Sequence, residues 1–213
     1  RILKRLGELE GNEHFAMFSS VSLNQFYGIE LTDFAAETAK LALFIAEYQA
    51  NARFADVFGR MPPLLPLRDG GQIRCDNALR VNWDEVCPPP AVGEEVFIAG
   101  NPPFVGSNFQ SDEQRNDRDR LFKKDFEAYK NLDYVAGWIY CASEYAQRSS
   151  GVSFAFVSTN SITQGRQVPS FWPKILGDLE IKFAHTSFKW QNNASANAAV
   201  ICVIIGISRR KTS

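Results

Sequence analysis

The chain has 213 residues, which is enough for one domain or two small ones. Hydrophobic residues make up 45% of it and charged residues 22%. These fractions are close to the average of globular proteins, so they exclude collagen, coiled coils and disordered tails. The formal net charge of −1 leaves no basic footprint over the whole chain. If a nucleic acid is the substrate, most contacts to its phosphates must therefore lie elsewhere.

The sequence shows no sign of a membrane span, a signal peptide, a metal site or a redox cysteine pair. The longest apolar run, residues 198–207, is about half of what a bilayer requires, so it predicts a buried strand. Residues 1–10 are charged and periodic, unlike a signal peptide. The two histidines form no metal-binding pattern, and we expect no metal site. The four cysteines lie too far apart for a zinc knuckle or a redox pair, and we expect them to be reduced, buried and structural in a cytoplasmic protein: Cys75, Cys87, Cys141 and Cys202.

The first part of the chain predicts a strand, a helix and a loop. Residues 26–31 (FYGIEL) predict a short strand, and residues 33–50 predict a helix that Thr32 or Asp33 can cap. Prolines and paired glycines over residues 51–72 predict a loop excursion. Four residues at helical spacing are expected to form the buried stripe of the helix: Phe34, Leu41, Ile45 and Tyr48.

The middle of the chain continues the alternation. Residues 73–79 (IRCDNAL) predict a short strand with its exit turn. A stiff proline-rich connector follows over residues 82–95. Residues 95–99 predict a strand that runs directly into a Gly-Asn-Pro-Pro-Phe sequence. The polar residues 106–131 are expected to be partly helical.

The last part predicts two helices and three strands. The helices cover residues 132–147 and 169–176, and an alternating strand covers residues 152–158. Residues 181–186 and 198–207 predict two further strands, joined by a polar loop that suits an antiparallel pair.

Alternating strands and helices predict a doubly wound α/β sheet with an antiparallel β-hairpin at its C-terminal end. Ligands of such sheets bind beyond the carboxyl ends of the strands. Glu30, Asp76 and Asn101 each stand at the exit of a predicted strand. We therefore expect these three polar side chains on one rim of the sheet.

The most specific motif is Asn101-Pro102-Pro103-Phe104. An exocyclic amine such as adenine N6 is a poor nucleophile, because its lone pair is delocalised into the ring. The Asn101 side-chain oxygen and the Pro102 carbonyl can accept from its two N–H groups, and the prolines stiffen the turn. Phe104 offers a flat face for an extruded base. The alternative is that Asn-Pro-Pro only turns the chain after a strand.

Three segments resemble those of class I S-adenosylmethionine-dependent DNA methyltransferases: GNPPFVGS, LDYVAGWIYCASEYA and SFAFVSTNSI. The order FYGIEL, Ala-rich helix, GNPPFVGS and LDYVA helix is most similar to the large MmeI-like restriction–modification enzymes. The resemblance covers about residues 20–207. It implies methyl transfer from S-adenosyl-L-methionine to N6 of a flipped adenine in double-stranded DNA. The resemblance also implies adenine N6 more than cytosine N4, because serine is commoner at the first motif position of the enzymes that methylate cytosine.

The resemblance also assigns roles to single residues. It implies that Glu30 binds the ribose hydroxyls of the methyl donor and that Asp76 accepts from the adenine amine of the cofactor. Asn77 joins the cofactor-binding set, in which Ile29 and either Ala78 or Leu79 flank the cofactor adenine. The structural alternatives are a solvated strand-end acid or a helix cap for Glu30, and a turn-forming residue for Asp76.

Two aromatic residues resemble the region that packs on the flipped base. Phe188 and Trp190 follow the predicted strand at 181–186, in a turn with a polar rim. The alternative is that both are ordinary core aromatics.

One family motif is missing from the chain. The glycine-rich cofactor loop, of Asp-Pro-x-x-Gly-x-Gly type, does not precede residue 20. We therefore expect residues 1–20 to be a helix tail and connector, and residues 21–207 to be a catalytic-domain fragment. Its Rossmann-like methyltransferase sheet would be incomplete, with exposed strand edges that favour self-association. Residues 208–213 would open a linker, and DNA recognition would need a domain absent from this chain.

Two other functions remain open. Protein-glutamine and RNA amine methyltransferases also use Asn-Pro-Pro-(Tyr/Phe), since a carboxamide or a base amine poses a similar chemical problem. A non-catalytic Rossmann-like module is the third possibility, and the missing glycine-rich loop supports it.

We expect the 213-residue chain on its own to bind S-adenosylmethionine weakly or not at all, because the glycine-rich loop is absent. Calorimetric titration of the folded chain with S-adenosylmethionine measures this affinity, with heat-unfolded chain as the control. Micromolar affinity would contradict the prediction.

Overall fold

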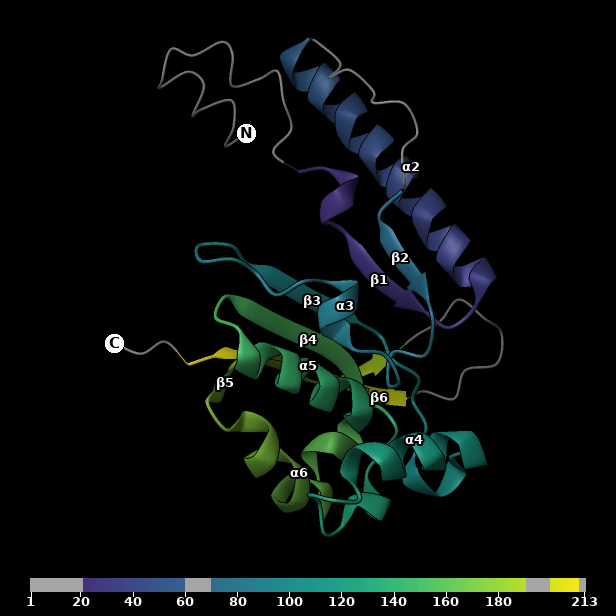
Figure 1. Ribbon diagram of the computed structural model, residues 1–213, viewed down its shortest axis with the longest axis vertical. Helices are drawn as coiled ribbons and strands as arrows, with labels where there is room; N and C mark the ends of the chain where they lie inside the picture. The colour runs from purple at the N-terminus through teal and green to yellow at the C-terminus, as the bar shows by residue number, and fades with distance from the viewer. Residues whose placement is uncertain (1–20, 60–69, 191–199, 211–213) are drawn as a thin grey trace. The chain divides into compact units, whose positions relative to one another are not determined.

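The structure is a computed structural model that describes residues 21–59, 70–190 and 200–210. It divides into two compact units, residues 1–81 and residues 82–213 (Figure 1). In the described residues, no helix is long and apolar enough to cross a membrane.

The first unit contains one strand–helix–strand motif. Strand β1 (Tyr27–Glu30) pairs in parallel with β2 (Gln72–Cys75), and helix α2 (Asp33–Phe58) lies between them in sequence. A parallel pair needs such a crossover, since a tight turn cannot join two strands of the same direction. Figure 1 shows α2 running beside the two strands. The Thr32 side chain accepts from the Ala35 amide at 3.2 Å, which confirms Thr32 as the helix cap.

Helix α2 differs from the sequence prediction at its end. It continues past residue 50 to Phe58, because residues 51–58 contain neither proline nor glycine. The first helix-breaking residue is Gly59, whose φ of 72° places it in the left-handed region.

The predicted buried stripe of α2 is also wrong. Ala36 is buried, and the side chains of Leu43 and Phe44 lie against the backbone of Gly71 and Gly70, just before β2. Because this helix is apolar on more than one side, its period alone could not identify the face that the strands would cover. The four residues expected to be buried are exposed: Phe34, Leu41, Ile45 and Tyr48.

The second unit contains a mixed sheet of strand order β3-β4-β6-β5. Strands β3 (Val96–Gly100) and β4 (Val152–Thr159) are parallel. Strand β6 (Val200–Arg209) is antiparallel to both β4 and β5 (Leu179–Trp190). This confirms the α/β class with an antiparallel pair at the C-terminal end. The polar loop predicted between these two strands lies outside the described residues, in the stretch 191–199.

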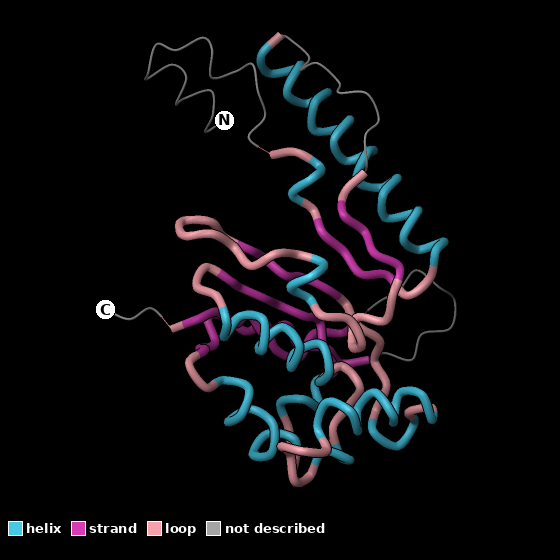
Figure 2. Tube along the Cα trace, in the orientation of Figure 1, coloured by secondary structure: helices cyan, strands magenta, loops and turns pink. Residues whose placement is uncertain are grey.

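Helices accompany this sheet in the order α3, α4, α5 and α6. Their bounds are Trp83–Val86, Asp112–Phe122, Ala136–Arg148 and Gln167–Leu176. Four short 3-10 turns complete the described chain: η2 (Leu23–Gln25), η3 (Ser107–Phe109), η4 (Tyr129–Asn131) and η5 (Asn160–Thr163). Figure 2 shows the strands of the second unit in magenta with helices gathered along one side.

Strand β2 ends at Cys75, and residues 77–80 form the exit turn that the sequence predicts. Two other predicted bounds in these segments are corrected. The connector over residues 82–95 contains α3, whose cap Asn82 accepts from the Asp84 amide. Helix α5 begins at Ala136, not at residue 132, since the backbone of Leu132 is extended, with a ψ of 134°.

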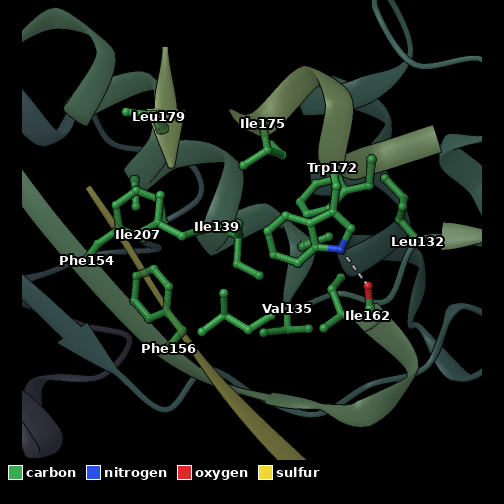
Figure 3. Close-up of a cluster of buried hydrophobic side chains, with 14 of the residues drawn as sticks. Leu132, Val135, Ile139, Phe154, Phe156, Ile162, Trp172, Ile175, Leu179 and Ile207 are labelled. Carbon is green, nitrogen blue, oxygen red and sulfur yellow. Dashed lines mark hydrogen bonds between the residues drawn. The ribbon is translucent and has the colours of Figure 1, made fainter. Parts of the chain in front are cut away.

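The core of the second unit lies between the sheet and its helices. Along β4, buried and half-buried residues alternate, as in a strand with one face packed. Its inward rings, Phe154 and Phe156, meet Ile139 of α5 in one buried cluster (Figure 3). The Trp172 indole N–H donates to the Ile162 carbonyl at 2.8 Å, so this large side chain is buried with its polar group paired.

The four cysteines are free, as predicted, but they are not all buried. Cys202 is buried on the central strand β6, and Cys87 and Cys141 are half-buried. Burial raises the pKa of the Cys141 thiol to about 12. Cys75 is exposed, because it lies on the two-stranded sheet of the first unit.

Gly151→Ala is expected to destabilise the second unit. Gly151 has a φ of 87°, and an added Cβ would lie 2.5 Å from the Glu94 carbonyl oxygen. Its own carbonyl accepts from the Val96 amide at 3.0 Å, next to the start of the β3–β4 pairing. We expect a loss of about 1–3 kcal/mol in the free energy of unfolding, measured by urea denaturation.

Gly165→Ala is the matched control for this substitution. Gly165 also has a positive φ, of 58°, but no atom lies within 4 Å of its added Cβ. It carries the backbone strain without the clash. An effect of Gly151→Ala no larger than that of Gly165→Ala would contradict the prediction.

Candidate active site

The first unit brings the two predicted cofactor-binding acids together. Glu30 ends β1, and Asp76 follows β2 directly. The parallel register pairs Glu30 with Cys75, and the Asp76 amide donates to the Glu30 carbonyl at 2.8 Å. Both acids are half-buried, at the carboxyl ends of neighbouring strands.

The turn after β2 is built by Asn77 more than by Asp76. The Asn77 side-chain oxygen accepts from the Leu79 amide at 2.9 Å, which closes the turn from the side chain. The Asp76 carboxylate accepts from the Asn77 amide at 2.8 Å and from the Arg74 guanidinium at 3.3 Å. A carboxylate has about four acceptor positions, so Asp76 retains capacity for a ligand.

The remaining predicted cofactor residues lie in the same unit. Ile29 and Ala78 are half-buried, whereas Leu79 is buried. Cys75 is the register partner of Glu30 and directly precedes Asp76. A hydrogen bond with Asp33, followed by burial and the negative charges of Asp33 and Asp76, raises the pKa of this thiol above its ordinary value. At this end of the first unit, the negative charge therefore lies on the carboxylates, and the Cys75 thiol stays protonated.

The Asn-Pro-Pro-Phe motif stands at the carboxyl end of β3, as the sequence predicts. Asn101 directly follows the last residue of the strand and is exposed, not turned into the core. Pro102 is buried, Pro103 is exposed and Phe104 is half-buried. The buried Pro102 ring has a fixed φ, so it restricts the backbone next to Asn101, while Asn101 itself remains at the surface.

The second unit also brings the predicted base-packing aromatics to this motif. The rings of Phe104 and Trp190 meet edge to face, with centroids 6.3 Å apart. The Trp190 ring lies 6.4 Å from that of Phe188. Both are half-buried residues of β5, which runs to Trp190, so the prediction that they lie in a turn after residue 186 is wrong. The hydrogen-bonded pairing with β6 explains this longer strand.

A bulge in β5 sets the direction of these two rings. His185 pairs with Ile204 and Phe188 with Cys202, so β5 has one extra residue between these two pairs, in addition to an irregularity between Ile181 and Phe183. Ser187 has a φ of 56°, in the left-handed region that serine rarely adopts. Since side chains alternate along a strand, the extra residue keeps Phe188 and Trp190 on the face of β5 that His185 occupies.

The two groups of predicted residues belong to different units. Glu30, Ile29, Asp76 and Asn77 lie in the first, and the motif with Phe188 and Trp190 lies in the second. We predict that both groups lie on one rim of a single sheet. Because the two groups belong to different units, this stays a prediction. In the described residues, no cluster of three or more potential metal ligands is present.

One buried acid next to the motif was missed. Asp133 is 7% exposed and accepts from the Ser107 amide, three residues after the motif. The sequence carries one signal for Asp133, which stands among apolar residues in LDYVA. An aspartate in a buried segment needs hydrogen-bond partners, so this position indicates a paired carboxylate.

The mixed sheet, with an Asn-Pro-Pro-Phe turn at the end of a parallel strand, belongs to the class of DNA methyltransferase domains. The family model described as the MmeI DNA-methyltransferase domain matches residues 1–213. The chain belongs to this family, which confirms the resemblance to MmeI-like enzymes.

Two relatives are similar over nearly the whole chain. DNA methyltransferase A of Bacillus subtilis (strain 168) is 48% identical over 207 residues, which are 96% of this chain and 23% of that protein. The Type IIL restriction–modification enzyme MmeI, solved in complex with DNA, matches with a TM-score of 0.80 and 39% identity. That match covers 91% of this chain and 26% of MmeI. The chain thus spans about a quarter of the length of each relative.

Ser187→Val is expected to lower stability, because a β-branched residue fits the left-handed region poorly. We expect a loss of about 1–2 kcal/mol in the free energy of unfolding, measured by urea denaturation. Ser187→Gly should stay within about 0.5 kcal/mol of the wild type. Thr186→Val, at the neighbouring exposed position, is the control. Equal effects of the valine substitutions at 186 and 187 would contradict the bulge geometry.

Proposed function

We propose that this domain transfers the methyl group of S-adenosylmethionine to N6 of adenine in double-stranded DNA, as part of a restriction–modification system. The observation that carries the proposal is the exposed Asn101 at the end of β3, with Phe104 of the same motif in contact with Trp190. The names of both relatives support DNA as the substrate.

The acids of the first unit fit the cofactor. S-adenosylmethionine would supply an electrophilic methyl group on a sulfonium sulfur. Glu30 would accept from the two ribose hydroxyls, and Asp76 from the adenine amine, each with a carboxylate at a strand end. The spare acceptor positions of Asp76 favour this role over a purely structural one.

The motif would orient the amine of the target base. The Asn101 side-chain oxygen and the Pro102 carbonyl would accept from the two N–H groups, so that the nitrogen lone pair points to the methyl carbon. S-adenosylmethionine would supply the methyl group as its S–C bond breaks and the N–C bond forms, and the proton displaced from the amine would leave to solvent. Phe104 and Trp190 would pack on the extruded adenine. The stiff Asn-Pro-Pro segment would hold these acceptors in place before the reaction, which would lower the cost of reorganisation.

The low net charge of the chain fits an enzyme in which a different domain makes most contacts to the DNA phosphates. With a net charge of −1, this domain would contribute chemistry and base packing, while a recognition domain would bind most phosphates. Bacterial DNA lies in the cytoplasm, so we propose that the enzyme acts there.

In the full-length protein, Asn101→Ala should reduce methylation by about 100-fold or more and leave cofactor binding nearly intact. The assay incubates unmethylated genomic DNA with S-adenosylmethionine and measures N6-methyladenine and N4-methylcytosine by mass spectrometry of the nucleosides. Asn131→Ala is the matched control, because Asn131 is an exposed asparagine of η4, outside the motif.

Each alternative function has its own outcome in this assay. Retained methylation by Asn101→Ala would remove its catalytic role, and N4-methylcytosine alone would replace adenine as the target. Methylation of a glutamine peptide or of RNA, but not of duplex DNA, would change the substrate class. A wild-type protein that methylates none of these would support a non-catalytic module.

A further inference from the structure

The segment after the motif is fastened at two points. The Tyr134 amide donates to the Val105 carbonyl at 2.9 Å, and the Ser107 amide donates to the Asp133 carboxylate at 3.3 Å. Val105 is the residue directly after Phe104. Within three residues of the motif, the chain is therefore hydrogen-bonded to residues 133–134, which precede α5.

The Asp133 carboxylate also reaches the end of β4. Its second oxygen accepts from the Thr159 hydroxyl at 3.1 Å and from the Ser161 hydroxyl. Thr159 is the last residue of β4, and Ser161 lies in η5 directly after it. One buried side chain thus joins the loop after β3 to the exit of the neighbouring strand.

Asp133 is itself held from several sides. Its amide donates to the buried Gln167 side chain of α6 at 3.2 Å. The preceding carbonyl, of Leu132, accepts from the buried Gln110 side chain at 3.0 Å. The following Tyr134 donates its hydroxyl to Asp117 at 3.0 Å. Because its backbone is fixed in this way, Asp133 can serve as a rigid anchor for the loop.

The position of the anchor matters for the motif. Strands β3 and β4 are parallel, with Gly100 opposite Phe156, so their carboxyl ends lie at the same edge of the sheet. Asn101 is held from one side by β3. Its other side is a loop, which is held by the Phe104–Trp190 ring contact, by the backbone bond at Val105 and by the bond from the Ser107 amide to Asp133.

We propose that Asp133 is a positioning residue for the Asn-Pro-Pro-Phe turn. It ties the loop over residues 105–107 to the end of β4, and so keeps the motif in the geometry that methyl transfer needs. This role rests on the proposed function. Asp133 does not touch the substrate, and its effect passes through the Ser107 amide and the Thr159 and Ser161 hydroxyls.

Hydrogen exchange of the full-length protein tests the anchor without any catalysis. In Asp133→Ala, peptides over residues 104–110 should exchange about tenfold faster or more, while peptides of α5 keep their protection. Asp133→Asn should recover part of the slow exchange, because its side-chain oxygen can still accept from Ser107. If the loop exchanges as in the wild type, or if α5 loses protection equally, the proposal is overturned.

Kinetics of the same proteins test the consequence for the reaction. Displacement of a positioned group by about 1 Å costs about 100-fold in rate, so Asp133→Ala should lower kcat by about 10- to 100-fold and leave the KM for S-adenosylmethionine unchanged. Glu127→Ala, at an exposed acid of the same segment, is the matched control. An unchanged kcat overturns the proposal.

A second variant keeps the test decisive if Asp133→Ala does not fold. Ser161→Ala removes one donor to the carboxylate and should lower kcat severalfold at constant KM, whereas a wild-type kcat overturns the proposal. When Asp133→Ala does fold, adding Ser161→Ala to it should lower kcat no further, since both act through one contact. If wild-type protein transfers no methyl group, the proposed function fails, and the exchange experiment alone decides whether Asp133 anchors the loop.

Discussion

The parallel pairing of β3 with β4 is the constraint on which the candidate site of the second unit depends. It places Asn101 and Thr159 at one edge, because two parallel strands end in the same direction. Strand β6 pairs antiparallel with β4, and β5 with β6, so β5 also ends at this edge. Trp190 can therefore meet Phe104, although 86 positions separate them in sequence (190 minus 104).

Polar contacts as well as apolar packing hold the chain at this edge of the sheet. Asn101 is exposed, so its position depends on the residues next to it and not on burial of its own side chain. Pro102 is buried on one side, and Asp133 accepts three hydrogen bonds from the loop and from the end of β4. A buried carboxylate is costly unless it is satisfied, and a satisfied one holds its partners in a single arrangement.

The local elements could be predicted because their signals are local. The cap Thr32, the alternation along β4 and the antiparallel pair at the C-terminal end each follow from a few adjacent residues. The predicted buried face of α2 was wrong because that face depends on contacts distant in sequence and not on a local signal. A helix that is apolar on several sides carries no local signal for the side that strands will cover, so Leu41 is exposed while Ala36 is buried.

The sequence by itself determined the α/β class, the strand before Asn-Pro-Pro-Phe and the family to which the chain belongs, because these depend on short patterns read in order. Only the tertiary structure decided the direction of Phe188 and Trp190 and the partners of Asp133. The first depends on one extra residue at Ser187, since a shift of one residue turns every later side chain to the opposite face. The second depends on hydrogen bonds between segments 26 or more residues apart, which no local pattern contains.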